Sequence, residues 1–131
     1  MSRPCPCTSK IPYDRCCGPY ITGAKAPESA ELLMRSRFSA YALGKVDYLI
    51  ETTAEAERGA LDREELVVYC RNIRCVGLKI LAREAGGPGD ATGTVKFHAS
   101  LQVNGKRSLH VELSRFVREG GRWRYVDGDS N

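Results

Sequence analysis

The sequence contains no long hydrophobic run, and no apolar segment lies near its start. No stretch approaches the ~20 apolar residues that a membrane-spanning helix needs, so no membrane span is expected. A secretory signal peptide would need an apolar core, whereas Arg3 is followed directly by Pro4 and a group of cysteines. These absences predict a cytoplasmic protein. Permanent disulfides are rare in that reducing compartment.

Internal repeats, low-complexity tracts and an extreme composition are missing as well. Of the 131 residues, 42% are hydrophobic and 27% are charged, which is a globular rather than a disordered balance. A chain of this length is the size of one typical domain, and it can bury a core that needs no disulfides.

The positive charge is concentrated at the N-terminal end. The net charge is +4, and residues 1–25 carry four bases against one acid, so +3 of it lies there. Such a basic arm can contact phosphate or an acidic protein surface, and it can also offset the charge of nearby thiolates. No pattern of basic and aromatic residues occurs elsewhere. Weak RNA or ribosome contact would therefore depend on this arm alone.

Helices are predicted in the first half of the chain, after an arm that is rich in proline and glycine. Apolar residues at three- and four-residue spacing predict a helix over 29–43 and a shorter one over 46–53. Asp62 is a predicted N-cap, with Glu65 three residues later, so a third helix is expected to begin there.

Strands are predicted in the second half, where apolar and polar residues alternate. This period-two pattern covers residues 73–82 and 94–103 and continues after Asn104-Gly105, a strong hairpin turn. A final strand contains Trp123 and Tyr125. Helices followed by an antiparallel meander predict an α+β fold, with the helices packed on one face of a curved sheet.

Four of the six cysteines lie in one short stretch, CPCTSKIPYDRCCGPY. Cys5, Cys7, Cys16 and Cys17 could form a disulfide staple, a redox pair or a metal site. A redox pair would usually show Cys-x-x-Cys at a helix start, and disulfides would need an oxidising compartment. Four thiolates suit a tetrahedral Zn²⁺ and would leave no open coordination position. The favoured interpretation is a structural Zn²⁺ cofactor rather than a catalytic one.

The same stretch resembles the SEC-C motif, a short zinc-binding element. The resemblance implies that Cys5, Cys7, Cys16 and Cys17 are the zinc ligands, and Ser9, Tyr13 and Gly18 match the framework of the motif. Thr8 stands where the motif usually has glycine, and Ile11-Pro12 replaces its usual glycine and lysine run.

The resemblance extends over nearly the whole chain. LMRSRFSAYALGKVDYLIETT (33–53) and SRFVREGGRWRYVDG (114–128) are similar to the YchJ family. This implies a SEC-C zinc-binding arm over 1–27 and a nuclear-transport-factor-2-like (cystatin-like) α+β domain over 28–131, in which N-terminal helices and a curved antiparallel sheet form a cone with a cavity. The family has no established activity.

Several residues are candidates for a site in such a cavity, because the cone-shaped fold carries both enzymes and binding modules. The candidates for ligand binding are Arg35, Arg37, Tyr41, Trp123 and Tyr125, and those for catalysis are His98, Tyr41 and Asp127. One arginine of the Arg35-Ser36-Arg37 run is expected to face solvent, and the other is expected to pair with a carboxylate or to bind an anion.

The two histidines are expected to face away from the helices. His98 alternates with apolar residues of its strand, and His110 and Glu112 alternate with Leu109 and Val111. If the apolar face of each strand packs on the helices, these polar groups face solvent. If the concave face is instead the polar one, the three groups share a cavity wall.

These observations leave three functional hypotheses. The leading one is a cytosolic, non-catalytic module that binds a protein or a small molecule and carries a structural zinc site. The second is an acid/base enzyme of the hydrolase, isomerase or dehydratase type that uses the cavity. The third is weak RNA or ribosome contact through the basic arm. A homodimer formed through exposed strand edges is a further hypothesis.

Overall fold

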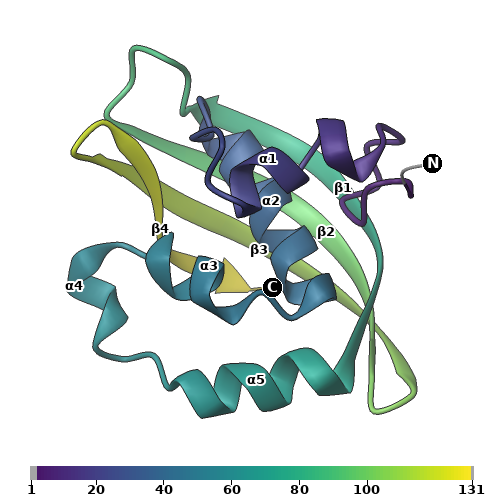
Figure 1. Ribbon diagram of the computed structural model, residues 1–131. Coiled ribbons are helices and arrows are strands. Elements are labelled where there is room, and N and C mark those ends of the chain that lie inside the picture. Colours follow the sequence, from purple (N-terminus) through teal and green to yellow (C-terminus); the bar gives the residue numbers. More distant parts are fainter. Residues whose placement is uncertain (1–2, 131) are drawn as a thin grey trace.

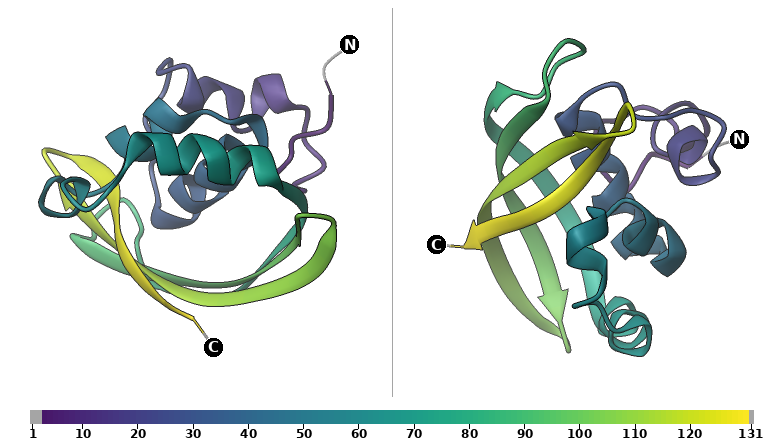
Figure 2. Two further views of the ribbon diagram at one scale, coloured as in Figure 1. Left: turned by 90° about the horizontal axis from the view of Figure 1, so that it is seen from below. Right: turned by 90° about the vertical axis from the view of Figure 1, so that its left-hand side faces the viewer.

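A single antiparallel sheet forms one side of the molecule. The computed structural model describes residues 3–130. Its strands are β1 (Ile73–Ala85), β2 (Thr92–Val103), β3 (Lys106–Glu119) and β4 (Arg122–Ser130), paired in the order β1-β2-β3-β4. The sheet is strongly curved, and the helices lie on its concave side (Figures 1 and 2). The predicted α+β fold is confirmed.

The helical layer precedes the sheet in the chain. It consists of the 3-10 turn η1 (Tyr13–Arg15) and the helices α1 (Gly18–Ile21), α2 (Ala30–Leu43), α3 (Val46–Glu51), α4 (Glu55–Arg58) and α5 (Arg63–Asn72). The longest helix, α2, crosses the concave face of the sheet, and α5 leads directly into β1 (Figure 1). No helix in the described part of the chain is long and apolar enough to cross a membrane.

The ends of the predicted elements follow from local sequence signals. The hydroxyl of Ser29 accepts a hydrogen bond from the backbone N–H of Leu32 at the start of α2. The carboxylate of Asp62 likewise accepts the backbone N–H groups of Glu64 and Glu65, which confirms the predicted N-cap of α5. The short helix α4 was not predicted. It is a single turn with no buried residue, so it is too short to show a helical periodicity of apolar residues.

The main core lies between α2 and strands β2 to β4. Its most buried members include Leu33 on α2, Val95 on β2 and Trp123 on β4. Cys5, Cys7 and Cys17 belong to the same cluster of buried residues. The N-terminal arm therefore packs onto the domain core.

The face of β3 that packs on the helices is the polar one, so the expected orientation of this strand is wrong. Ser114 and Phe116 are buried, whereas Leu109 is 59% exposed. The reason is the register of the hairpin. Asn104 and Gly105 form the predicted two-residue turn, with φ angles of 51° and 83°. Residues 103 and 106 are thus paired, so odd positions of β2 share a face with even positions of β3.

Candidate functional site

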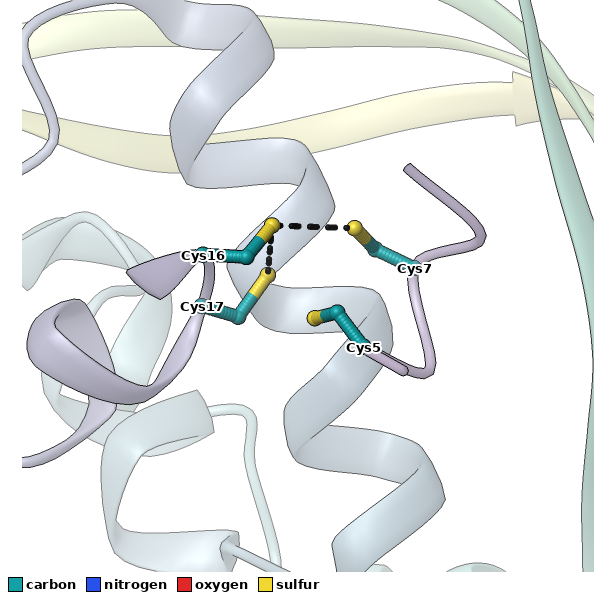
Figure 3. Close-up of side chains that lie close together, drawn as sticks. All are labelled: Cys5, Cys7, Cys16 and Cys17. Atoms are coloured by element: carbon teal, nitrogen blue, oxygen red, sulfur yellow. Dashed lines mark hydrogen bonds between the residues drawn. The ribbon is translucent and has the colours of Figure 1, made fainter. Parts of the chain in front are cut away.

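Four thiols converge at the N-terminal end (Figure 3). Cys5 and Cys7 lie on the first loop, and Cys16 and Cys17 lie between η1 and α1. All four Sγ atoms lie within 4.8 Å of one another, and Cys16 Sγ is 3.5 Å from that of Cys7 and 4.0 Å from that of Cys17. Tetrahedral zinc, with bonds of about 2.3 Å, needs sulfurs separated by about 3.8 Å. The four thiols are free. They therefore fit a tetrahedral metal ion.

The loop that presents Cys5 and Cys7 is folded by backbone hydrogen bonds. The N–H of Cys5 donates to Ile11 O, and the N–H of Tyr13 donates to Arg3 O. Thr8 has a φ of 62°, a left-handed conformation that favours glycine. Its hydroxyl lies 2.9 Å from Leu78 O on β1, which anchors the loop to the sheet. The departure from the motif at Thr8 therefore has a structural role.

The cysteine cluster is connected to helix α2. The hydroxyl of Ser39 lies 3.4 Å from Cys5 Sγ, and Nη1 of Arg35 donates to Cys7 O at 3.3 Å. Arg35 also pairs with Glu31 at 2.9 Å. Since these groups surround the cluster from one side, α2 is its principal support.

The sulfurs strongly affect one another's protonation. Hydrogen bonds from Cys17 and Ser9 lower the pKa of Cys7 to about 4, although burial opposes this shift. Burial raises the pKa of Cys16 to about 11, and contact with Cys7 together with burial raises the pKa of Cys17. One negative charge is therefore readily accommodated without metal. Ionising the remaining thiols requires a cation in the cluster.

A cavity of about 300 Å³ lies on the other side of α2, between that helix, α5 and the concave face of the sheet. Part of its wall is apolar, with Met34, Phe38, Phe97 and Leu101 among the lining residues. The rest is polar and is formed by side chains of α2, α5, β3 and β4. This volume is at the lower end of the range typical of small-molecule sites.

The Glu112 carboxylate is the centre of the polar wall. One of its oxygens lies 2.9 Å from His110 Nε2, and the other accepts hydrogen bonds from the Ser114 hydroxyl at 2.5 Å and from the Tyr125 hydroxyl at 3.2 Å. A Cβ atom at Gly128 on β4 would overlap this carboxylate. Glycine at this position therefore makes room for the charged group.

Arg37 is the buried cation of the cavity. Its side chain comes from α2 and the residue is 8% exposed. Nη1 donates to Leu49 O and to the hydroxyls of Thr52 and Thr53, and the guanidinium lies 4.6 Å from the centre of the Tyr125 ring. Burial lowers the pKa of Arg37, but arginine remains charged at neutral pH.

Arg37 forms no direct ion pair with a carboxylate within residues 3–130, although the charge of Glu112 in the same cavity favours its charged form. The carboxylates of Asp47 and Asp127 do not pair with Arg37, because Asp47 pairs with Arg63 and Asp127 pairs with Arg115. Within the described chain, Nε and Nη2 of Arg37 make no hydrogen bond. Since Arg37 lines the cavity, these two nitrogens are available to a ligand.

The structure separates the predicted site residues into two groups. Arg37, Tyr41 and Tyr125 line the cavity. His98, Arg35, Trp123 and Asp127 do not. His98 lies on the opposite face of the sheet, where it pairs with Val111. Trp123 is 1% exposed and donates from Nε1 to Glu28 O, and Asp127 is exposed. Their positions leave these four residues no direct role in the cavity.

His110 and Glu112 were expected in the cavity only if its concave face were the polar one, and they do line it, whereas His98 does not. The signal that could have found them is the Asn104-Gly105 turn. A two-residue turn pairs Ala99 with His110 and Phe97 with Glu112, so the polar face of β3 must lie beside the apolar face of β2.

Comparison with known proteins agrees with these features. The family model for the YchJ middle NTF2-like domain matches residues 29–128. The UPF0225 protein of Geobacter sulfurreducens is 37% identical over 128 residues, which are 98% of this chain and 80% of that protein.

Two solved structures have the same fold over nearly the whole chain. A SEC-C motif containing protein from Rhodopseudomonas palustris has a TM-score of 0.87 and 33% identity, covering 100% of this chain and 99% of that one. Another from Psychrobacter arcticus has a TM-score of 0.81 and 26% identity, covering 97% of this chain and 81% of that one.

Proposed function

We propose that this chain, which belongs to the YchJ family, is a small-molecule-binding protein whose cavity takes a compact ligand with a carboxylate or similar anionic group. The observation that carries the proposal is Arg37. A buried charge without a direct ion pair is costly, and Glu112 compensates Arg37 only through space, so an anion that arrives with the ligand would stabilise it.

The shape of the cavity limits the ligand. Arg37 offers the edge of its guanidinium, which suits a planar carboxylate that accepts two hydrogen bonds. The apolar wall around Phe38, Phe97 and Leu101 favours an aliphatic or aromatic body. The hydroxyl of Tyr41 makes no hydrogen bond within the described residues, so it can donate to a second polar group of the ligand.

The cysteine cluster completes this proposal as a structural zinc site. Four thiolates would close the coordination sphere, and the Cys7 backbone and Arg35 join the cluster to the helix that carries Arg37. We assign the zinc a role in holding α2 in place and no role in chemistry. A reducing compartment such as the cytoplasm keeps these thiols available to the metal.

Ligand binding can be tested by titrating the protein with acetate, benzoate and 2-oxobutyrate while backbone amide resonances are recorded. Benzamide serves as the neutral control. We expect the carboxylates to shift resonances of cavity residues, and Arg37→Met to weaken their binding by about 10- to 100-fold, as the loss of hydrogen bonds to a charged group predicts. Arg35→Met is the matched control, because this arginine lies outside the cavity.

The ligand-binding proposal fails if no carboxylate shifts the cavity resonances, or if Arg37→Met binds the carboxylates as well as the wild type does.

The zinc assignment is tested separately by elemental analysis of the purified protein. One zinc per chain is expected, with loss on Cys16→Ser and retention on Cys70→Ser. A content well below one that does not change with Cys16→Ser contradicts it.

A further inference from the structure

We propose that His110 and Glu112 form an acid/base dyad that moves a proton between solvent and the carbon next to the carbonyl of a small 2-oxo acid in the cavity. The substrate class rests on the proposed function, because Arg37 is the group that would bind its carboxylate. The dyad itself rests on the arrangement of side chains along the polar face of β3.

The hydrogen bonds of Glu112 determine the tautomer of His110. The Glu112 carboxylate accepts from Ser114 and Tyr125 at one oxygen, and its other oxygen lies 2.9 Å from His110 Nε2. An ionised carboxylate can only accept, so His110 must carry its proton on Nε2. Nδ1 then keeps a free electron pair. A carboxylate that orients a histidine in this way also stabilises the imidazolium formed when Nδ1 takes a proton.

The position of His110 allows a ligand to reach it. Its side chain is 38% exposed and lines the cavity, whereas the carboxylate behind it is 15% exposed. Phe97 lies beside it, with ring centres 6.2 Å apart. The imidazole is thus supported on one side by Phe97 and fixed at Nε2 by Glu112. The open nitrogen is the one that could act on a ligand.

The other reactive side chains of the cavity wall are less suited to catalysis. Cys75 lines the cavity, but burial raises its pKa to about 11, so it is a poor nucleophile at neutral pH. The hydroxyl of Ser114 is buried and already donates to Glu112. A free imidazole nitrogen and a buried cation that line the same cavity are the groups that proton transfer from carbon requires.

The proposed step is balanced without any other reactant. Nδ1 of His110 takes a proton from the carbon next to the carbonyl, the electrons of the broken C–H bond form a C=C bond, and the carbonyl electrons move to oxygen. The enolate that results is stabilised by the charge of Arg37 and by the Tyr41 hydroxyl. The imidazolium then returns a proton to carbon. In deuterated solvent this proton is replaced by deuterium.

The experiment follows deuterium incorporation into 2-oxobutyrate by proton NMR, with free imidazole at the same concentration as the chemical reference. We expect the wild type to exceed this reference, and His110→Gln to lose about 100-fold or more of the excess, as removal of a general base predicts. Glu112→Gln should lose about tenfold or more, because the amide no longer favours the same tautomer. His98→Gln is the matched control and should leave the rate unchanged.

A second measurement does not depend on the substrate. The nitrogen shifts of the two histidine side chains report their tautomers, and His110 is expected in the form protonated on Nε2. The opposite tautomer would contradict the dyad.

Deuterium exchange no faster than with free imidazole, or exchange that survives His110→Gln in a folded variant, would also contradict it. If 2-oxobutyrate binds in an Arg37-dependent way but does not exchange, the dyad fails and the binding function stands. If it neither binds nor exchanges, both fail.

Discussion

The cysteine cluster and the cavity share helix α2, yet they are built in opposite ways. The cluster gathers four chemically similar groups from 13 neighbouring positions, and its geometry is decided by local turns. The cavity gathers unlike groups from α2, α5 and all four strands, with Arg37 and Glu112 far apart in the sequence. The geometry of one region therefore depends mainly on local turns of the chain. The other depends on the packing of the whole domain.

Different residues of α2 serve the two regions. Arg35 and Ser39 contact the cluster, whereas Arg37 and Tyr41 line the cavity. Residues two apart on a helix point in different directions, so a single helix can serve both regions. Changes at one face should reach the other through the position of the helix and through the buried core that the two regions share.

Removal of the metal should have the largest effect. Structural zinc sites in small peptides contribute on the order of 10–16 kcal/mol of apparent binding free energy at neutral pH, and in the proposed zinc site that energy would stabilise the N-terminal arm. We expect Cys7→Ser or a strong chelator to lower the free energy of unfolding by several kcal/mol. Denaturant unfolding checks this, with Cys70→Ser as the control. An unchanged unfolding free energy would mean that the cluster does not support α2.

Gly128→Ala should have the next largest effect, and it should be confined to the cavity. The added Cβ would overlap the Glu112 carboxylate, so the charged group must move from its three donors. We expect a loss of about 1–3 kcal/mol of unfolding free energy, which is typical of overpacking, with unchanged zinc content. The double variant with Glu112→Ala should regain part of this loss. Additive effects of the two substitutions would contradict the contact.

Substitutions of Thr8 should distinguish backbone strain from hydrogen bonding in the cysteine loop. Thr8→Ala keeps the side-chain cost of a positive φ but loses the contact with Leu78 O, so a destabilisation of about 1 kcal/mol is expected. Thr8→Gly loses the same contact but relieves the strain, and it should be close to neutral. Thermal unfolding of the zinc-bound protein measures both. Equal losses in the two variants would show that the φ angle carries no cost.

The smallest effect is expected for the cavity thiol of Cys75, and it concerns a reaction rate rather than the free energy of unfolding. Burial raises the pKa of Cys75 from 9.0 to about 11, so at pH 8 about 100-fold less thiolate is present than for an unperturbed thiol. Its alkylation by iodoacetamide should be slow and should rise about tenfold per pH unit up to pH 11. Peptide mass spectrometry can follow it separately from the cluster. Fast alkylation at pH 8 would mean that the cavity wall is not buried as described.

The sequence allowed a good prediction of the parts that depend on neighbouring residues. The N-cap at Asp62 and the turn at Asn104-Gly105 are confirmed, because each is decided within a few residues. The orientation of β3 was predicted incorrectly. Leu109, Val111 and Leu113 were expected to be its core face, since hydrophobicity alone was used and the register implied by the turn was not.

The sequence by itself determined which four cysteines converge and in what order helices and strands follow, since spacing and local hydrogen bonds are enough for both. Only the tertiary structure decided that Arg37 is buried without a carboxylate and that Glu112 lies between His110, Ser114 and Tyr125. The physical reason is that burial and charge pairing depend on contacts between residues distant in the chain. The register of the strands and the packing of α2 on the sheet determine which of these contacts form.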